Sequence, residues 1–205
     1  MYLPKDIDIE PTTVLAGCIF VYENFWENSN NTIDEIETVL NDKNGFFQWN
    51  RAAVLTEESH QYNKHRTNSD FNLSYYAPFN ETFRQLQNEL FIKTFSVVMS
   101  FCRKMGIRES LHFDESFNVL KYQTGQEYKA HYDGGTATKR AISLILYLND
   151  DYEGGHLEFT HQNLTIKPKP GMLVVFPSNY PYAHIAHPVT NGTKYAVVNW
   201  VHDQP

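Results

Sequence analysis

At 205 residues the chain has the length of one domain, and a hydrophobic fraction of 41% is sufficient for a packed core. Its 17 Lys and Arg residues against 24 Asp and Glu residues give a formal net charge of −7, which argues against a surface that neutralises nucleic-acid phosphates. The two cysteines, Cys18 and Cys102, are too few for a disulfide framework or a Cys-rich zinc site, and we expect two buried free thiols.

The N-terminal residues show no basic stretch followed by an apolar run, which a secretory signal would require. The apolar run 14–22 is too short to span a bilayer and is followed directly by Glu23 and Asn24. We therefore expect a soluble, cytoplasmic protein with neither a membrane nor a nucleic-acid partner. The oligomeric state is left open.

The first half of the chain predicts helices between strands. A long helix is the clearest element, because apolar residues recur at helical spacing and Gly106 supplies a C-terminal stop. Residues 57–73 are polar and lack an apolar period, which predicts a long loop. The expected elements are a strand over 14–22, a helix over 33–40 capped by Asn31 or Thr32, a turn at Asn44-Gly45, a strand over 46–55, the loop over 57–73 and a helix over 81–105.

From residue 113 the pattern changes to short apolar segments separated by Gly, Pro and Asn. Roughly eight strands at this spacing predict a barrel or sandwich, and helices before strands predict helices packed on one side of a sheet. We predict an α+β, mainly β fold in one domain over 1–205, in which 1–112 support a core over 113–205. The expected strands cover 117–122, 128–133, 140–149, 156–160, 164–167, 172–177, 184–189 and 194–202.

The triplet His131-Tyr132-Asp133 is the main candidate for metal binding. Side chains two residues apart on a strand point to the same face, so His131 and Asp133 are placed to share one ion. One more imidazole would complete the 2-His-1-carboxylate facial triad of non-haem Fe(II) oxygenases. A competing pair, His156 and Glu158, has the same spacing but directly follows an acidic turn, where exposed polar residues are ordinary.

Two histidines are candidates for the third ligand. His184 and His187 are three residues apart, so on one strand they face opposite sides of the sheet, and only one of them is expected to face the metal. Position alone does not decide between them. The other histidines are expected to be solvated or structural, namely His60, His65, His112, His161 and His202.

Lys194 is the single charge on an otherwise apolar strand over 194–200. A lysine that points into a barrel costs several kcal/mol unless an anion meets it, although most lysines point outward. Tyr122 and Tyr147 lie at the ends of apolar segments, where their hydroxyls are placed to donate to the same anion or simply to pack with a wet tip.

Together these residues resemble the catalytic region of the 2-oxoglutarate- and Fe(II)-dependent prolyl 4-hydroxylases, especially the small soluble bacterial and viral forms. The resemblance covers about 40% of the chain, in residues 117–202, and extends more weakly to 21–26 and 65–69. The matching residues are Tyr122, His131-Tyr132-Asp133, Arg140, Tyr147-Leu148-Asn149, Gly154-Gly155, 168–171, His184, Lys194 and Trp200.

The resemblance implies a double-stranded β-helix (jelly-roll) core with helices packed on the major sheet. It implies that His131, Asp133 and His184 bind Fe(II), that 2-oxoglutarate and O2 are cosubstrates, and that ascorbate is a reductant. Lys194 would bind the distal carboxylate of 2-oxoglutarate, with Tyr122 and Tyr147 beside it. Two departures stand out, because many relatives carry Cys where this chain has His187 and an acidic residue where it has His156.

The implied function is hydroxylation of peptidyl proline, with release of succinate and CO2. Arg66, Arg140, Tyr128 and Trp200 are candidates for the substrate channel, over which the 57–73 loop would close. One alternative is an oxygenase that acts on another residue or a small metabolite. A second is a barrel that binds metal or 2-oxoglutarate without turnover, and a zinc hydrolase is a distant third because no general base is evident beside the triad.

Overall fold

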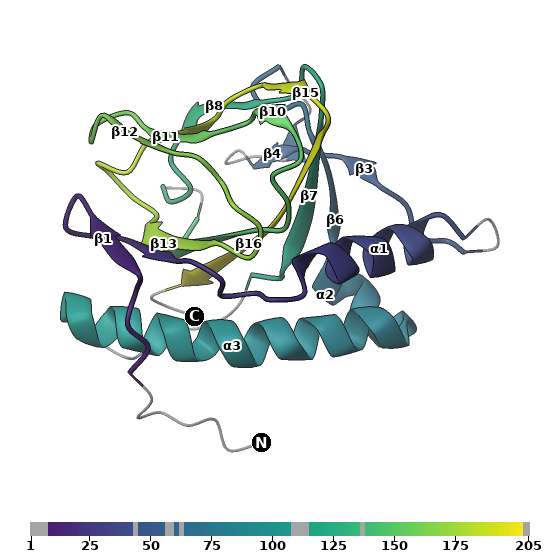
Figure 1. Ribbon diagram of the computed structural model, residues 1–205, viewed down its shortest axis with the longest axis horizontal. Coiled ribbons are helices and arrows are strands. Elements are labelled where there is room, and N and C mark those ends of the chain that lie inside the picture. Colours follow the sequence, from purple (N-terminus) through teal and green to yellow (C-terminus); the bar gives the residue numbers. More distant parts are fainter. Residues whose placement is uncertain are drawn as a thin grey trace.

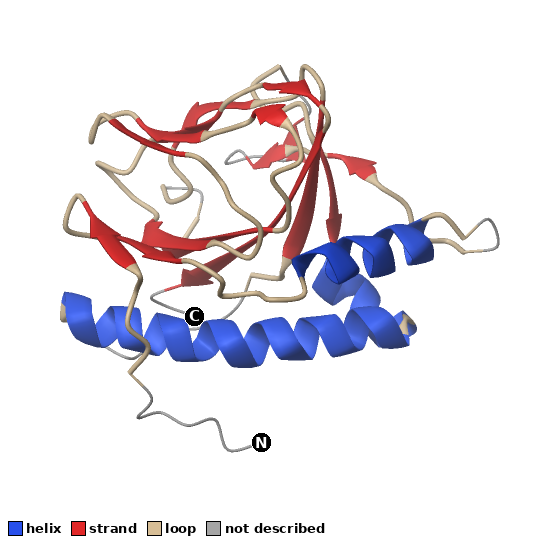
Figure 2. Cartoon of the chain, viewed as in Figure 1, coloured by secondary structure: helices blue, strands red, loops and turns tan. Residues whose placement is uncertain are grey.

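The computed structural model describes residues 8–42, 45–55, 60–61, 64–107, 115–135 and 138–202. Strands dominate this part of the chain, and the helices gather on one side of it (Figure 1; Figure 2). The α+β, mainly β class predicted from the sequence is confirmed. The predicted boundary at residue 113 and His112 lie outside the described residues, as do residues 43–44, 56–59 and 62–63 of the expected turn and loop.

The larger sheet has eight strands in the order β1-β2-β13-β9-β16-β7-β6-β3, and each neighbouring pair is antiparallel. Four strands from the second half of the chain form its centre, and strands from the first half flank them on both sides, since β2 pairs with β13 and β6 pairs with β7. The strand bounds are β1 Thr13–Leu15, β2 Ile19–Tyr22, β3 Asn50–Arg51, β6 Ser69–Asn72, β7 Asn118–Gln123, β9 Arg140–Tyr147, β13 Leu173–Pro177 and β16 Thr193–His202.

A four-stranded sheet in the order β12-β11-β14-β8 lies opposite the larger one, and two small ribbons, β10-β15 and β4-β5, complete the strands described (Figure 1). The bounds are β4 Val54–Leu55, β5 His60–Gln61, β8 Tyr128–His131, β10 Glu153–Gly154, β11 Leu157–Phe159, β12 Leu164–Ile166, β14 His184–Ala186 and β15 Val189–Asn191. The two sheets therefore face each other around a shared interior.

Alternation along the central strands creates two cores. On β16, Val197 belongs to a cluster shared with the helices, whereas Ala196 and Val198 belong to a cluster between the sheets. The same division separates Leu146 from Ile145 on β9. Because both faces of these strands are buried, they read as continuous apolar runs rather than as alternating ones.

The helices cover the outer face of the larger sheet. They are α1 Ser29–Leu40, α2 Leu73–Tyr76, the 3-10 helix η1 Ala77–Phe79 and α3 Glu81–Met105. The prediction for α3 is confirmed at both ends: Asn80 Oδ1 accepts the Phe83 N–H at 3.1 Å, and Gly106 takes the left-handed conformation that ends the helix. Phe101 of α3 meets Phe20 of β2 edge-on, with ring centroids 4.8 Å apart.

Several N-terminal predictions were wrong in detail. The expected strand 14–22 is a hairpin, because Ala16 and Gly17 take positive φ values that reverse the chain between β1 and β2. The first helix begins at Ser29 rather than at residue 33, and neither predicted residue caps it. The Thr32 hydroxyl instead accepts the indole N–H of Trp26 at 2.8 Å.

The expected strand 46–55 forms only β3 and β4, and the expected loop 57–73 contains β5 and β6. The sequence of β6 shows no alternation of apolar and polar residues, because the strand lies beside β7 near the sheet edge and only Phe71 in it is fully buried. Farther on, the predicted strand 184–189 divides into β14 and β15, and Cys18 is only half-buried, whereas Cys102 is buried as expected.

Within the described residues, the structure contains no helix that is both long and apolar enough to cross a membrane.

The contact between α3 and the sheet predicts the cost of truncating Phe101, which is fully buried. We expect Phe101→Ala to lower the free energy of unfolding by about 3–5 kcal/mol, because it leaves a cavity and removes the edge-on contact with Phe20. Urea denaturation measures this change. The control is Phe79→Ala at a side chain that is 64% exposed, where the change should stay within about 0.5 kcal/mol. Equal effects would contradict the packing argument.

Candidate metal centre

Two paired strands bring the predicted ligands together. His131 at the end of β8 is the direct cross-strand partner of His184 at the start of β14. Asp133 lies two residues beyond His131, just past the end of its strand. One ligand atom from each of the three side chains lies within 4.8 Å of the other two, so the three positions converge on a single point.

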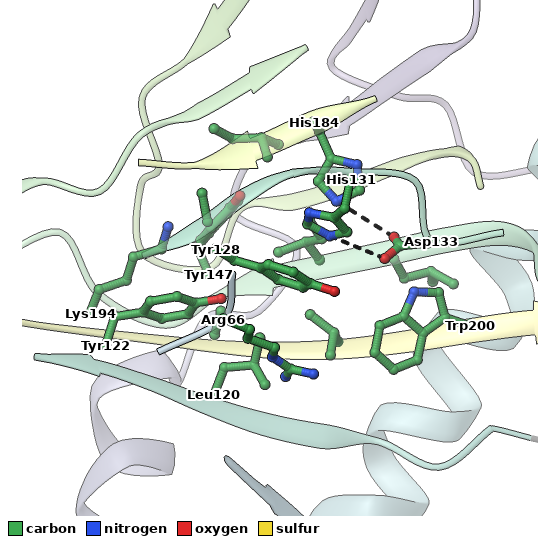
Figure 3. Close-up of a pocket in the computed structure, with 16 residues that line it drawn as sticks. Arg66, Leu120, Tyr122, Tyr128, His131, Asp133, Tyr147, His184, Lys194 and Trp200 are labelled. Atoms are coloured by element: carbon green, nitrogen blue, oxygen red, sulfur yellow. Dashed lines mark ion pairs between the residues drawn. The ribbon is translucent and has the colours of Figure 1, made fainter. Parts of the chain in front are cut away.

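The carboxylate of Asp133 lies to one side of the two imidazoles and faces both of them (Figure 3). Its Oδ1 is 3.5 Å from His131 Nε2, and its Oδ2 is 3.6 Å from His184 Nε2. The other ring nitrogens face backbone carbonyls: His131 Nδ1 lies 2.7 Å from the oxygen of Lys129, and His184 Nδ1 lies 3.2 Å from that of Tyr182. A carbonyl only accepts, so each Nδ1 carries the proton and each Nε2 is left as a ligand.

The charge of Asp133 is stabilised although the side chain is buried. Burial raises the pKa of its carboxyl, but His184, His131 and Arg140 outweigh this effect and hold that pKa well below its usual range. The Ser143 hydroxyl donates to Asp133 Oδ2 at 2.7 Å, and the Ser178 hydroxyl lies 2.8 Å from that of Ser143. The carboxylate is therefore ionised and oriented before any ion binds.

His184 is buried, and this lowers its pKa to about 4, with His131 contributing in the same direction. Its imidazole is therefore neutral at pH 7, which is the form that binds metals.

Gly134 permits the turn that places Asp133. A Cβ atom at this position would lie 2.0 Å from Asn179 Oδ1 and 2.8 Å from the Arg140 carbonyl oxygen, so no larger residue fits without displacing backbone. The Gly134 N–H donates to the Ser178 carbonyl at 2.9 Å, which ties the turn to the end of β13.

A cavity between the sheets joins the three ligands to Lys194 (Figure 3). Lys194 extends into one end of this cavity, between Tyr122 and Tyr147, with its Nζ 5.3 and 5.1 Å from the two ring centroids. His131, Asp133 and His184 lie toward the other end. Lys194 thus points inward, as one of the two sequence interpretations predicted.

Lys194 is a buried cation with little to balance it. Its side chain is almost fully buried, and its Nζ donates to the Gly155 carbonyl at 2.5 Å. No carboxylate within 4 Å of this ammonium is found among the residues that the structure describes. Burial lowers its pKa to about 7. An anion that entered the cavity would remove this desolvation penalty, so the residues fit a dicarboxylate that reaches from Lys194 to the metal.

Arg66 and Tyr128 line the same cavity. The Tyr128 ring stacks on the His131 ring, with centroids 3.5 Å apart. The Arg66 guanidinium carbon lies over the Tyr128 ring, 5.2 Å from its centroid. Arg66 also donates to Asn68, to the Ala53 carbonyl and to Asp70. It is therefore held in place and largely shielded from solvent.

Arg140 and Trp200 lie where the cavity continues into a wider polar groove. The Arg140 guanidinium lies 3.6 Å from the Trp200 ring centroid and forms a two-point ion pair with Glu115 at 2.5 and 2.7 Å. Asp70 and Arg51 add charges of both signs to the groove walls. All four predicted substrate residues thus lie along one path that leads to the ligands.

Sequence reasoning missed Ser143, Ser178 and Glu115. Ser143 had a readable signal, since it is the one polar residue between Ala141 and Leu146 in an otherwise apolar strand. The contacts of Ser178 and Glu115 join residues that are distant along the chain, and neither residue lies in a distinctive local pattern.

Residues 117–202 match the sequence model of the 2OG-Fe(II) oxygenase superfamily. This segment contains every proposed metal ligand together with Lys194, Tyr122 and Tyr147. This segment is similar to the 2OG-Fe(II) oxygenases. The donor set agrees with that similarity, because two imidazoles and one carboxylate converge beside a buried cation.

Similar curated proteins are prolyl hydroxylases. The oxygenase segment and its surroundings are 34% identical over 119 residues to a probable prolyl 4-hydroxylase 9 of Arabidopsis thaliana, covering 44% of this chain and 41% of that protein. A putative prolyl 4-hydroxylase of Acanthamoeba polyphaga mimivirus is 30% identical over 130 residues, or 51% of each chain. The human prolyl 3-hydroxylase 3 is 35% identical over 103 residues, 48% of this chain and 13% of that one. The chain thus spans about half or less of the length of these relatives.

Solved structures share the fold over most of the chain. A prolyl hydroxylase from Trichoplax adhaerens, in complex with a hypoxia inducible factor peptide fragment, has a TM-score of 0.69 at 17% identity, with 92% of this chain and 84% of that chain covered. A Pseudomonas putida prolyl-4-hydroxylase has a TM-score of 0.66 at 17% identity, with 91% and 93% covered. At these identities the likeness concerns the fold.

The contact between Ser143 and Asp133 predicts a role in metal affinity. We expect Ser143→Ala to weaken Mn(II) binding about tenfold to a hundredfold, because it frees a carboxylate that the hydroxyl orients. Calorimetric titration measures the affinity, and circular dichroism checks the fold. Ser178→Ala is the matched control, since that hydroxyl contacts Ser143 rather than the carboxylate. A loss as large in the control would assign the effect to packing.

Proposed function

We propose that the chain is a 2-oxoglutarate- and Fe(II)-dependent dioxygenase that hydroxylates peptidyl proline, in the manner of a prolyl 4-hydroxylase. The observation that carries this proposal is the shared cavity, in which two histidines and a carboxylate converge at one end and a buried lysine lies at the other. The relatives named as prolyl 4-hydroxylases support the choice of substrate.

The proposed core is a double-stranded β-helix. The larger sheet and the four-stranded sheet face each other, and the interior between them holds a cluster of buried side chains contributed by both sheets. In this arrangement the metal lies between the sheets where β8 and β14 meet, and the helices stiffen the larger sheet from outside.

His131, Asp133 and His184 would hold Fe(II), and Lys194 would bind the distal carboxylate of 2-oxoglutarate. When bound, Fe(II) and 2-oxoglutarate supply the activation of O2 that hydroxylates an unactivated C–H bond and releases succinate and CO2. The chain contributes orientation and enclosure. Tyr122 and Tyr147 form the apolar walls beside Lys194, and Tyr128 covers one face of His131. The sequence also suggests ascorbate as a reductant, and this stays a prediction.

The polar groove would hold the peptide. It leads from Asp133 past Arg140 and Trp200, so a substrate chain in it would pass close to the metal. Arg66 and Arg140 present fixed N–H donors that suit backbone carbonyls, and the Trp200 ring offers a flat surface for a proline ring. Because Asp70 and Glu115 already pair with the two arginines, the groove favours a neutral peptide over an acidic one.

The test is product formation by Fe(II)-reconstituted protein with O2, 2-oxoglutarate and a panel of proline-rich peptides. We expect succinate release coupled to a gain of one oxygen atom in the peptide, located on proline by fragmentation. Amino-acid analysis then distinguishes 4-hydroxyproline from 3-hydroxyproline, a distinction that matters because prolyl 3-hydroxylases are also among the similar proteins.

Two variants and three alternative outcomes define the result. His131→Ala and Asp133→Ala should abolish turnover while the circular dichroism spectrum is unchanged, since each removes one ligand from the centre. Succinate release without any modified peptide would keep the oxygenase and assign it another substrate. Absence of succinate from metal-loaded protein would favour a barrel that binds metal or 2-oxoglutarate without turnover. Near wild-type activity in either variant would contradict the ligand assignment.

The lowered pKa of Lys194 predicts how 2-oxoglutarate affinity depends on pH. Above about pH 7 the free lysine loses its proton, and a bound carboxylate favours the protonated form, so binding must take up a proton. From about pH 7 to about pH 8.5 we expect the dissociation constant to rise about tenfold. Anaerobic calorimetry in buffers of different ionisation enthalpy measures both the affinity and the proton uptake.

Lys194→Arg is the matched control for this prediction, because its guanidinium stays protonated throughout the range and should give a nearly flat profile. A slope as steep in the arginine variant would assign the proton to another group. Lys194→Ala should lose 2-oxoglutarate affinity while keeping metal affinity.

A further inference from the structure

A second group of possible ligands lies on the outer face of the four-stranded sheet. His156, Glu158 and His187 each offer an atom within 4.8 Å of the other two, and all three side chains are partly exposed. None of them lines the cavity that contains the first centre. Alternation explains the separation, since Leu157 and Phe159 of β11 face the interior core and Glu158 between them faces outward.

The backbone relation among these residues repeats that of the first centre. There, His131 is opposite His184 and the carboxylate follows His131 by two residues. In the second group, the pairing of Leu157 with Ala186 places His156 opposite His187, the His187 N–H donates to the His156 carbonyl at 3.0 Å, and Glu158 follows His156 by two residues. The strand β14 is shared, with His184 turned inward and His187 following on the outer face.

The side chains are already in contact. His187 Nε2 lies 2.6 Å from Glu158 Oε2, with the two side chains 28% and 33% exposed. The rings of His156 and His187 stack with centroids 3.9 Å apart and planes inclined by 19°. Two ligands of a tetrahedral ion with bond lengths of about 2.0–2.2 Å lie about 3.4 Å apart, so the carboxylate and the imidazole must separate by about 0.8 Å and the stacked rings must turn toward a common point.

Two imidazoles with one carboxylate are a donor set for borderline transition metals such as Zn(II), whereas Mg²⁺ and Ca²⁺ prefer all-oxygen sites. Three protein ligands at a partly exposed surface also leave room for water at the fourth position of a tetrahedron.

We propose that His156, Glu158 and His187 form a second metal site, on the opposite face of the sheet from the first, which binds Zn(II) or a similar divalent transition metal. This inference stands on the geometry of the outer face and does not depend on the oxygenase chemistry.

The experiment counts zinc ions per chain. Tag-free protein is equilibrated with Zn(II) by dialysis, and metal content is measured for wild type, His131→Ala, His187→Ala and the double variant. Because Zn(II) also suits the first centre, we expect about two, one, one and no ions respectively. Glu158→Gln should weaken the second site about tenfold or more, and His161→Ala, an exposed histidine outside both groups, should bind as wild type does.

The outcomes separate the two sites. If His187→Ala and Glu158→Gln bind as much zinc as wild type with the same affinity, the second site is overturned, whatever happens at the first. If the His131→Ala variant binds one zinc ion and the double variant binds none, the second site stands, even if the protein shows no turnover. Nitrogen hyperfine coupling from Cu(II) in the His131→Ala protein, lost on His187→Ala, gives a second readout that changes in folding would not imitate.

Discussion

The antiparallel pairing of β8 with β14 is the constraint on which the metal centre depends. Its register sets His131 opposite His184, and a slip of one residue in either strand would turn the imidazole of that strand to the outer face. The third ligand depends on this pairing in turn, because each Asp133 carboxylate oxygen faces the Nε2 atom of one of the two imidazoles. Without the register the carboxylate and the two imidazoles would no longer converge on one point, so the donor set depends on the strand pairing.

Features that follow from local spacing were predicted well from the sequence. The helix α3 agrees at both ends because Asn80 and Gly106 act on their immediate neighbours. His131 and Asp133 follow from the two-residue period of a strand, and Lys194 follows from being the one charge on an apolar segment. Each of these signals is contained within a few residues, so it can be read without knowing which distant segments pack together.

Features that depend on pairing between distant segments were not predictable in this way. The strand β6 exists because β7 offers it a partner almost 50 residues later, and its own residues lack an alternating pattern. The choice between His184 and His187 also depended on a partner strand, and the family resemblance rather than the spacing resolved it. The hydrogen bond from Ser143 to Asp133 belongs to the same class, since it joins β9 to the turn after β8.

The unequal burial of the larger sheet has a consequence for motion. The central strands β13, β9 and β16 are covered on both faces, so their amides should exchange with solvent only through the rarest and most global openings. Asp70, in contrast, lies in β6, next to the short edge strand β3, where fewer buried contacts oppose local opening. The part of the groove wall that β6 and β3 form should therefore exchange its amides with solvent sooner than β16, the strand that carries Lys194.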